Sequence, residues 1–213
     1  MTRRLLLITH SYSPESTAPQ RRWKKFLFGL YDAGWNVKVL TPPADPRYVD
    51  EAQKPEPHVT VRRTPHVSSL PDSRAGRLAK AVVHAATSVP LALTQDVDVV
   101  VATVPALPNL VAGRVIAWIK GVPYVVEMRD AWPDLIFESE SGGKLFGTLV
   151  ADVVTRIQRS ADQLITVTKG FAETLEQRNM PPVEVISNSR AIEQMPPIEA
   201  RARAAGELHV LYL

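Results

Sequence analysis

Short apolar runs alternate with amphipathic stretches along most of the chain. The apolar runs have the length and composition of buried strands and lie at residues 5–9, 36–41, 58–63, 97–102, 124–126, 163–168 and 183–186. Apolar residues at helical spacing predict helices that run from Thr17 to Gly34 and over residues 74–94, 108–120, 144–160 and 172–178. Because strands and helices alternate, the pattern predicts an α/β fold, a Rossmann-like doubly wound parallel sheet with helices on both faces.

The periodicity also predicts which helix faces are buried. On the first helix the expected buried residues are Trp23, Phe26, Leu27, Leu30 and Tyr31. On the helix at 74–94 they are Leu78, Val82, Val83, Ala86 and Val89. Thr17 and Gln20 have the spacing of a capping box, and Gly34 suits the end of the first helix.

Composition restricts the function classes only weakly. The chain has 213 residues, 45% of them hydrophobic and 22% charged, which is typical of a globular protein. A net charge of +3 gives little support to nucleic-acid binding, so we expect no nucleic-acid partner. The chain has no cysteine, which excludes disulfides and thiolate metal sites and suits a cytoplasmic location. The apolar run at residues 5–8 is too short for a signal peptide.

The last 25 residues change in character. Residues 189–206 are polar and have the composition of a linker, and residues 207–213 begin a fresh apolar strand. We therefore expect one domain over residues 1–188, an interdomain linker, and the first strand of a truncated second domain missing from this chain.

The densest candidate chemistry follows the apolar run at 124–126. Glu127, Arg129, Asp130 and Trp132 lie together where this strand ends, and ligands of open parallel sheets bind beyond the carboxyl ends of the strands. The pattern indicates a catalytic or binding site. An ion-paired loop, in which Arg129 neutralises Asp130 and Trp132 covers an apolar rim, is the alternative that the sequence leaves open.

Further polar residues follow other strands at the same predicted edge of the sheet. They are His10, Glu15 and Ser16 after the first strand, Thr103 after the fourth, and Thr168 and Lys169 after the sixth. His10 is suited to bind a sugar hydroxyl or a phosphate, with a structural role equally open. Helix capping is an alternative for the threonines, favoured for Thr168.

The sequence has candidate residues for binding a phosphate, but not for binding a dinucleotide or a metal ion. Arg21 and Arg22 lie at a helix N-terminus, where backbone donors favour anions. Residues 9–20 contain no glycine, so the dinucleotide fingerprint is absent. Asp96 and Asp98 match an Asp-x-Asp metal motif but precede a strand, which puts them at the opposite edge, and no metal site is predicted.

The helix that begins near Arg74 carries Arg77 and Lys80 beside apolar residues. Such a helix can settle on an anionic membrane surface, so we expect a peripheral contact with the inner face of the cell membrane. The alternative is an internal helix with a solvated basic end.

Five segments together resemble family-four glycosyltransferases of the GT-B type. Residues 5–14 and 32–41 resemble the family's opening strand–helix–strand unit, and residues 103–107 resemble its Thr-Ser-Pro-Pro-Leu turn. Residues 127–134 (Glu-Met-Arg-Asp-Ala-Trp-Pro-Asp) resemble the Glu-x-Arg-Asp-Leu-Trp-Pro-Glu signature of bacterial envelope and O-antigen sugar transferases. Residues 185–189, which include Asn188, stand where the family has Val-Ile-Pro-Asn-Gly. Ser16, Thr17 and Ala18 replace a glycine pair common in the family.

The resemblance implies the acceptor-side, N-terminal half of a GT-B fold. It implies a metal-independent enzyme, without a cofactor, that transfers sugar from a nucleotide-diphosphate sugar to a glycan or polyprenyl-linked acceptor with retained configuration. Asp130, supported by Arg129 and Glu127, is the expected catalytic group, and Arg21 and Arg22 would touch an acceptor diphosphate. This chain alone would be inactive. A non-hydrolysing nucleotide-sugar epimerase and a stand-alone α/β binding module are the alternatives.

Overall fold

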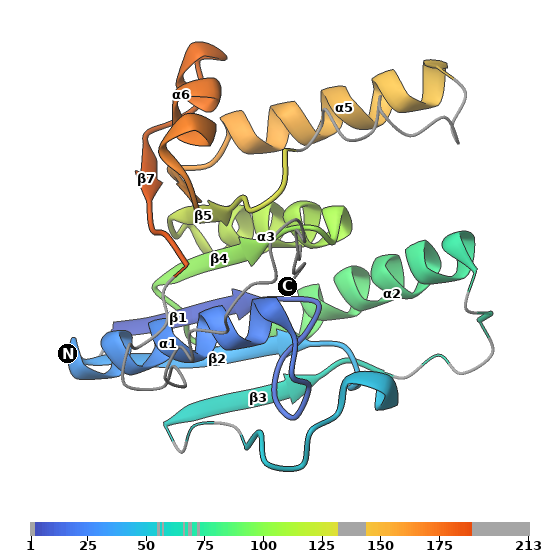
Figure 1. The fold of residues 1–213 in the computed structure, drawn as a ribbon, viewed down its shortest axis with the longest axis vertical. Coiled ribbons are helices and arrows are strands. Elements are labelled where there is room, and N and C mark those ends of the chain that lie inside the picture. Colours follow the sequence, from blue (N-terminus) through green and yellow to red (C-terminus); the bar gives the residue numbers. More distant parts are fainter. Residues whose placement is uncertain are drawn as a thin grey trace, which may run out of the picture.

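Parallel strands form one sheet through the middle of the molecule (Figure 1). The structure is a computed structural model that describes residues 3–54, 56, 58–65, 67, 70–71, 73–131 and 144–188. Within these residues the strands are β1 (Arg3–Ile8), β2 (Trp35–Thr41), β3 (Val59–Arg63), β4 (Val99–Thr103), β5 (Tyr124–Glu127), β6 (Gln163–Thr166) and β7 (Val183–Val185). Their order is β3-β2-β1-β4-β5-β6-β7, and every neighbouring pair is parallel.

Helices cover both faces of this sheet. They are α1 (Ala18–Asp32), α2 (Arg74–Leu93), α3 (Leu107–Lys120), α5 (Lys144–Arg159), α6 (Lys169–Gln177) and the short 3-10 helix η1 (Pro46–Tyr48). Along the sheet, β2 lies on one side of β1, whereas β5 lies on the opposite side of β4. Since such crossovers are right-handed, the reversal puts α1 on one face and α3 on the other (Figure 1). The predicted Rossmann-like, doubly wound fold is confirmed.

Strand β1 joins two separate hydrophobic cores because its side chains alternate between the faces of the sheet. Leu5 and Leu7 pack with Trp23 and Leu27 of α1. Leu6 and Ile8 belong to the larger core. Its members from β4, α3 and β5 include Val100, Ala102, Leu110, Ile116, Tyr124 and Val126. Apolar side chains on both faces explain why the strands are continuous apolar runs.

The start of α1 confirms half of the expected capping box. The Thr17 hydroxyl accepts a hydrogen bond from the Gln20 backbone N–H at 3.4 Å. The Gln20 side chain does not complete the box, because its amide donates to Ser13 Oγ at 3.1 Å. At the other end, Gly34 has φ +80°, as expected for a helix C-terminus. Tyr31, predicted to be buried, is exposed and stacks on His58.

Helix α2 is rotated relative to the sequence prediction. Leu78 and Val82, expected inside, are 54% and 49% exposed, and Ala86 is also exposed. The buried face of α2 carries small and polar side chains, namely His84, Ala85, Ser88 and Ala92. Helix α2 packs against α3, and Val89 packs against the larger core as predicted.

The segment after β2 is held against the β1–α1 loop by backbone hydrogen bonds. The Ser16 N–H donates to the Tyr48 carbonyl at 2.8 Å, and the Asp50 N–H donates to the Pro14 carbonyl at 2.9 Å. The expected linker at 189–206 and strand at 207–213 lie outside the described residues. Among the helices that the structure describes, none is long and apolar enough to cross a membrane.

Candidate functional site

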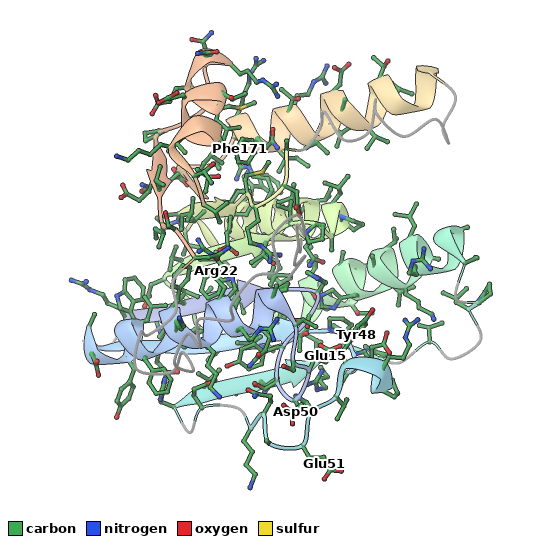
Figure 2. All side chains as sticks on the ribbon, in the orientation of Figure 1. Glu15, Arg22, Tyr48, Asp50, Glu51 and Phe171 are labelled. Carbon is green, nitrogen blue, oxygen red and sulfur yellow. The ribbon has the colours of Figure 1, made fainter. Side chains whose placement is uncertain are left out.

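Glu127 is the centre of a polar cluster at the carboxyl end of β5. Its side chain is fully buried and accepts hydrogen bonds from Arg22 Nε at 2.6 Å and from Trp23 Nε1 at 2.8 Å. Both donors come from α1, so the carboxylate joins α1 to the sheet (Figure 2 labels Arg22). A buried carboxylate needs such partners because burial removes its hydration.

Arg129 and Asp130 follow two and three residues later. Arg129 Nη2 donates to the Val104 carbonyl at 2.6 Å, and its Nε lies 4.0 Å from Glu127 Oε2. Burial lowers the pKa of the Arg129 guanidinium, while Glu127 and Asp130 oppose this change. Arg129 therefore has partners from β5 and from the turn after β4, not from Asp130 alone as the ion-paired loop would require.

Arg22 links this cluster to the end of the described chain. Its Nη1 donates to Asn188 Oδ1 at 3.0 Å, and its guanidinium lies over the Phe26 ring at 4.5 Å. Arg22 Nη2 is buried and has no hydrogen-bond partner among the described residues. The sequence prediction of a phosphate-binding Arg22 did not anticipate that Glu127 holds this side chain.

An open cavity of about 1220 Å³ lies at the same edge of the sheet, and Glu127, Arg129 and Asp130 are not among its lining residues. It is bounded by the segments that follow β1, β2, β3 and β4 and by one side of α2. His10, Glu15 and Thr17 line it from the β1–α1 loop. The cavity therefore occupies the crevice at the carboxyl ends of the strands, where the fold predicts a ligand site.

Two histidines line the cavity from different elements. Burial lowers the pKa of His10 to about 4, and the charge of Arg129 adds to this effect. Burial also lowers the pKa of His84 to about 4, with His10 as a second cause and the Thr9 backbone opposing it. His84 Nδ1 lies 2.9 Å from Thr64 Oγ1. Both imidazoles are consequently neutral at pH 7.

Glu15 has a structural role at the wall of this cavity. Its carboxylate accepts hydrogen bonds from the Tyr12 N–H at 3.0 Å and from the Asp45 N–H at 2.9 Å. Figure 2 shows Glu15 close to Tyr48, whose carbonyl accepts from the neighbouring Ser16 N–H. These bonds fix the β1–α1 loop against the segment after β2.

The remaining predicted site residues have other contacts or lie outside the described residues. Thr103, expected at the lip of the crevice, is fully buried and donates to Thr9 Oγ1 at 3.2 Å. Thr168 caps α6 by accepting from the Phe171 N–H at 3.3 Å, and Lys169 is exposed beside it. Arg21 is exposed on α1. Trp132 lies outside the described residues.

The Asp-x-Asp pair lies at the opposite edge of the sheet, as predicted. Asp98 accepts hydrogen bonds from the backbone N–H and the side chain of Arg4, and Asp96 lies 3.2 Å from Arg4 Nη1. In the part of the chain that the structure describes, no three His, Cys, Asp or Glu side chains group as metal ligands.

His84 is a cavity residue that sequence reasoning missed. The large apolar residues of α2 predicted that the opposite face of the helix is buried. A second helical pattern was present in the small residues Ala81, Ala85, Ser88 and Ala92, and His84 lies on that side. Small residues at helical spacing were the available signal.

Solved structures with a similar fold are sugar-transferring enzymes. Sucrose-phosphate synthase from Thermosynechococcus elongatus matches with a TM-score of 0.67 at 14% identity, over 92% of this chain and 50% of that one. UGT2 from Phytolacca americana, solved with UDP-2fluoro-glucose and pterostilbene, has a TM-score of 0.60 at 15% identity, over 88% and 54%. Arabidopsis thaliana UGT89C1 with UDP-L-rhamnose has a TM-score of 0.59 at 13% identity, over 88% and 52%. The chain thus spans about half the length of these proteins.

A comparison with curated proteins found no match. The family model described as glycosyl transferase 4-like domain matches residues 17–189, which is most of the chain. This range contains α1, the Glu127 cluster and both α2 and α3. The chain belongs to the glycosyl transferase 4-like domain family.

Proposed function

We propose that this chain is the acceptor-side half of a retaining glycosyltransferase related to family four. It would receive sugar from a nucleotide-diphosphate sugar held by a second domain. The observation that carries this proposal is the 1220 Å³ cavity, which lies at the carboxyl ends of the strands, the same edge of the sheet at which β5 leads into Arg129 and Asp130. The family match supports the reaction class, and the similar enzymes solved with UDP-sugars support the type of donor.

The residues of the cluster suit the charges of such a reaction. Sugar transfer develops negative charge on the leaving diphosphate and positive charge on an oxocarbenium-like sugar. Asp130 is proposed to orient the acceptor hydroxyl or to face the positive sugar centre. Arg129 and Glu127 act as positioning residues, because Glu127 holds Arg22 and lies beside Arg129. No metal or other cofactor takes part in the proposed mechanism.

The proposed acceptor is a glycan or polyprenyl-linked sugar, used in making cell-envelope polysaccharide at the cytoplasmic face of a membrane. The basic start of α2 supports a peripheral membrane contact, because Arg77 and Lys80 lie near the exposed side chain of Leu78 on one helix. The epimerase alternative is not favoured, because the matching family and the similar solved structures are sugar transferases.

The test is a transfer assay with the full-length protein, isotope-labelled UDP-sugars and polyprenyl-diphosphate sugars. We expect a glycosidic product whose anomeric configuration, read by NMR, is that of the donor. Asp130→Asn should lower turnover at least about tenfold with an unchanged unfolding transition. The matched control is Asp96→Asn, the same change at the opposite edge of the sheet, which should leave turnover unaltered.

Each other outcome removes a defined part of the proposal. An inverted product would exclude retention, and full turnover by Asp130→Asn would exclude Asp130 from the mechanism. Epimerised nucleotide sugar formed without any acceptor would favour the epimerase.

A further inference from the structure

The walls of the cavity are mainly apolar. Proline and aliphatic side chains from α2 and from the segments after β2, β3 and β4 contribute, among them Pro43, Pro46, Pro65, Leu78, Ala81 and Pro105. Prolines provide apolar surface that loses little conformational entropy when a ligand covers it. The volume of about 1220 Å³ also exceeds the usual range of roughly 300–1000 Å³ for small-molecule sites. A single sugar ring would leave much of this surface in contact with water.

Several polar groups at the cavity already have protein partners. Glu15 accepts two backbone N–H bonds, Thr17 caps α1, and Thr64 contacts His84. Asp45 is paired with the guanidinium of Arg47 at 2.6 Å. Sugar recognition depends on polar groups that can exchange hydrogen bonds with hydroxyls. The cavity therefore offers a free glycan fewer hydrogen-bond partners than the number of its polar lining residues suggests.

His10 carries an unpartnered polar atom at these walls, in the described part of the chain. Its Nδ1 is buried and has no hydrogen-bond partner within the described part of the chain. Because His10 and His84 are neutral, they can exchange a hydrogen bond with an uncharged hydroxyl and do not attract an anion. His10 also lies close enough to Arg129 to feel its charge, so this end of the cavity adjoins the Glu127 cluster.

Leu78 gives the cavity an apolar side chain that is about half exposed in the part of the chain that the structure describes. It is 54% exposed and lines the cavity, whereas Val82, one turn later on α2, is 49% exposed and does not. A ligand with an apolar body would bury Leu78, and burial of apolar surface is favourable by about 25 cal/mol per Å². An exposed leucine is ordinary alone, but here it completes an apolar wall.

We infer that the cavity binds an acceptor with a long apolar body, such as a lipid-linked sugar, whose hydroxyl end lies at His10 and whose apolar body covers Leu78. This inference rests on the proposed function, because that function makes the bound ligand the acceptor of the transfer reaction. It selects the lipid-linked class over a free glycan. The apolar body, not the sugar, would supply most of the affinity.

The experiment titrates the protein with octyl glucoside, below its micelle concentration, and with methyl glucoside, followed by calorimetry without any donor. Octyl glucoside should bind at least about tenfold more tightly. Leu78→Asn should weaken octyl glucoside binding at least about fivefold and leave methyl glucoside unchanged. Val82→Asn, the matched control on the same helix, should stay within about twofold of the unaltered protein.

Equal affinity for the two glucosides would overturn the inference, as would equal effects of Leu78→Asn and Val82→Asn. These results are separable from the proposed function because no transfer is measured. Selective octyl glucoside binding by a protein that transfers no sugar would reject the function alone. Efficient transfer to free glycans without any preference for an apolar chain would reject the inference alone.

Discussion

At the scale of single residues, Glu127 is the side chain on which most of the site geometry depends. It is fully buried, and α1 supplies both of its hydrogen-bond donors. Ionised groups in a protein interior persist only when a partner compensates the lost hydration. Arg22 is that partner for Glu127, and Glu127 in turn lets Arg22 stay buried while it reaches Asn188.

Neutralising Glu127 should therefore destabilise the protein more than an ordinary surface change. In Glu127→Gln the Arg22 guanidinium stays buried without its counter-charge, and we expect a loss of about 3 kcal/mol in the free energy of unfolding. Urea denaturation followed by tryptophan fluorescence measures this, since Trp23 lies at the altered group. Asp96→Asn is the control, because its exposed ion pair should contribute less than about 1 kcal/mol. Equal losses would mean that water reaches Glu127.

At the scale of elements, the contact of α3 with the sheet depends on a glycine. A Cβ placed on Gly113 would lie 2.7 Å from Tyr124 Cε2 and 2.9 Å from the Ala102 Cβ. Tyr124 cannot easily move away, because it is fully buried and its hydroxyl donates to the Leu110 carbonyl at 2.8 Å. The missing side chain lets α3 approach β4 and β5 closely.

Gly113→Ala should consequently lower the free energy of unfolding by about 1–3 kcal/mol through overpacking. The matched control is Gly29→Ala in α1, where a Cβ would meet nothing within 4 Å. There the better helix propensity of alanine should raise stability by roughly 0.5–1 kcal/mol. Thermal denaturation of both variants gives the comparison. A stabilised Gly113→Ala would show that α3 packs less closely than described.

The sequence predicted the elements well because each apolar run and each helical period is a local property. The orientation of α2 was wrong because burial depends on the neighbouring helix. Periodicity favoured Leu78 and Val82 as inward residues, whereas Ala85 and Ser88 are the buried ones in the helix that packs against α3. The pattern of small residues within α2 was the available signal for this face, but large apolar residues at the same spacing competed with it.

The candidate site was predictable in its location but not in its pairings. Strand order puts residues that follow different strands at one edge, which explains why His10, Glu127 and Arg129 lie near one another. The Glu127–Arg22 pair joins residues that are 105 positions apart. Its formation depends on how α1 sits on the sheet, and spacing along the chain carries no information about that.

At the scale of the whole molecule, the cavity and the Glu127 cluster share one edge of the sheet and meet at His10. His10 feels the charge of Arg129 on one side and lies near His84 on the other. Folding removes both imidazoles from water, and the burial penalty keeps them neutral. In the unfolded chain both imidazoles are in water, so protonating them there carries no burial penalty. The stability of the folded protein therefore depends on pH.

The free energy of unfolding should therefore fall as pH drops from 6.5 towards 4. Both histidines have a pKa near 6.5 in the unfolded chain and about 4 in the folded protein. Between these values the unfolded chain binds more protons, so acidification favours unfolding, by about 1 kcal/mol per histidine between pH 7 and 5.5. Urea denaturation at a series of pH values measures the slope. In His84→Gln the loss over this interval should shrink by about half, whatever the absolute stability of that variant at pH 8. An unchanged slope would mean that His84 takes up its proton in the folded protein as readily as in the unfolded chain, and that water reaches this end of the cavity.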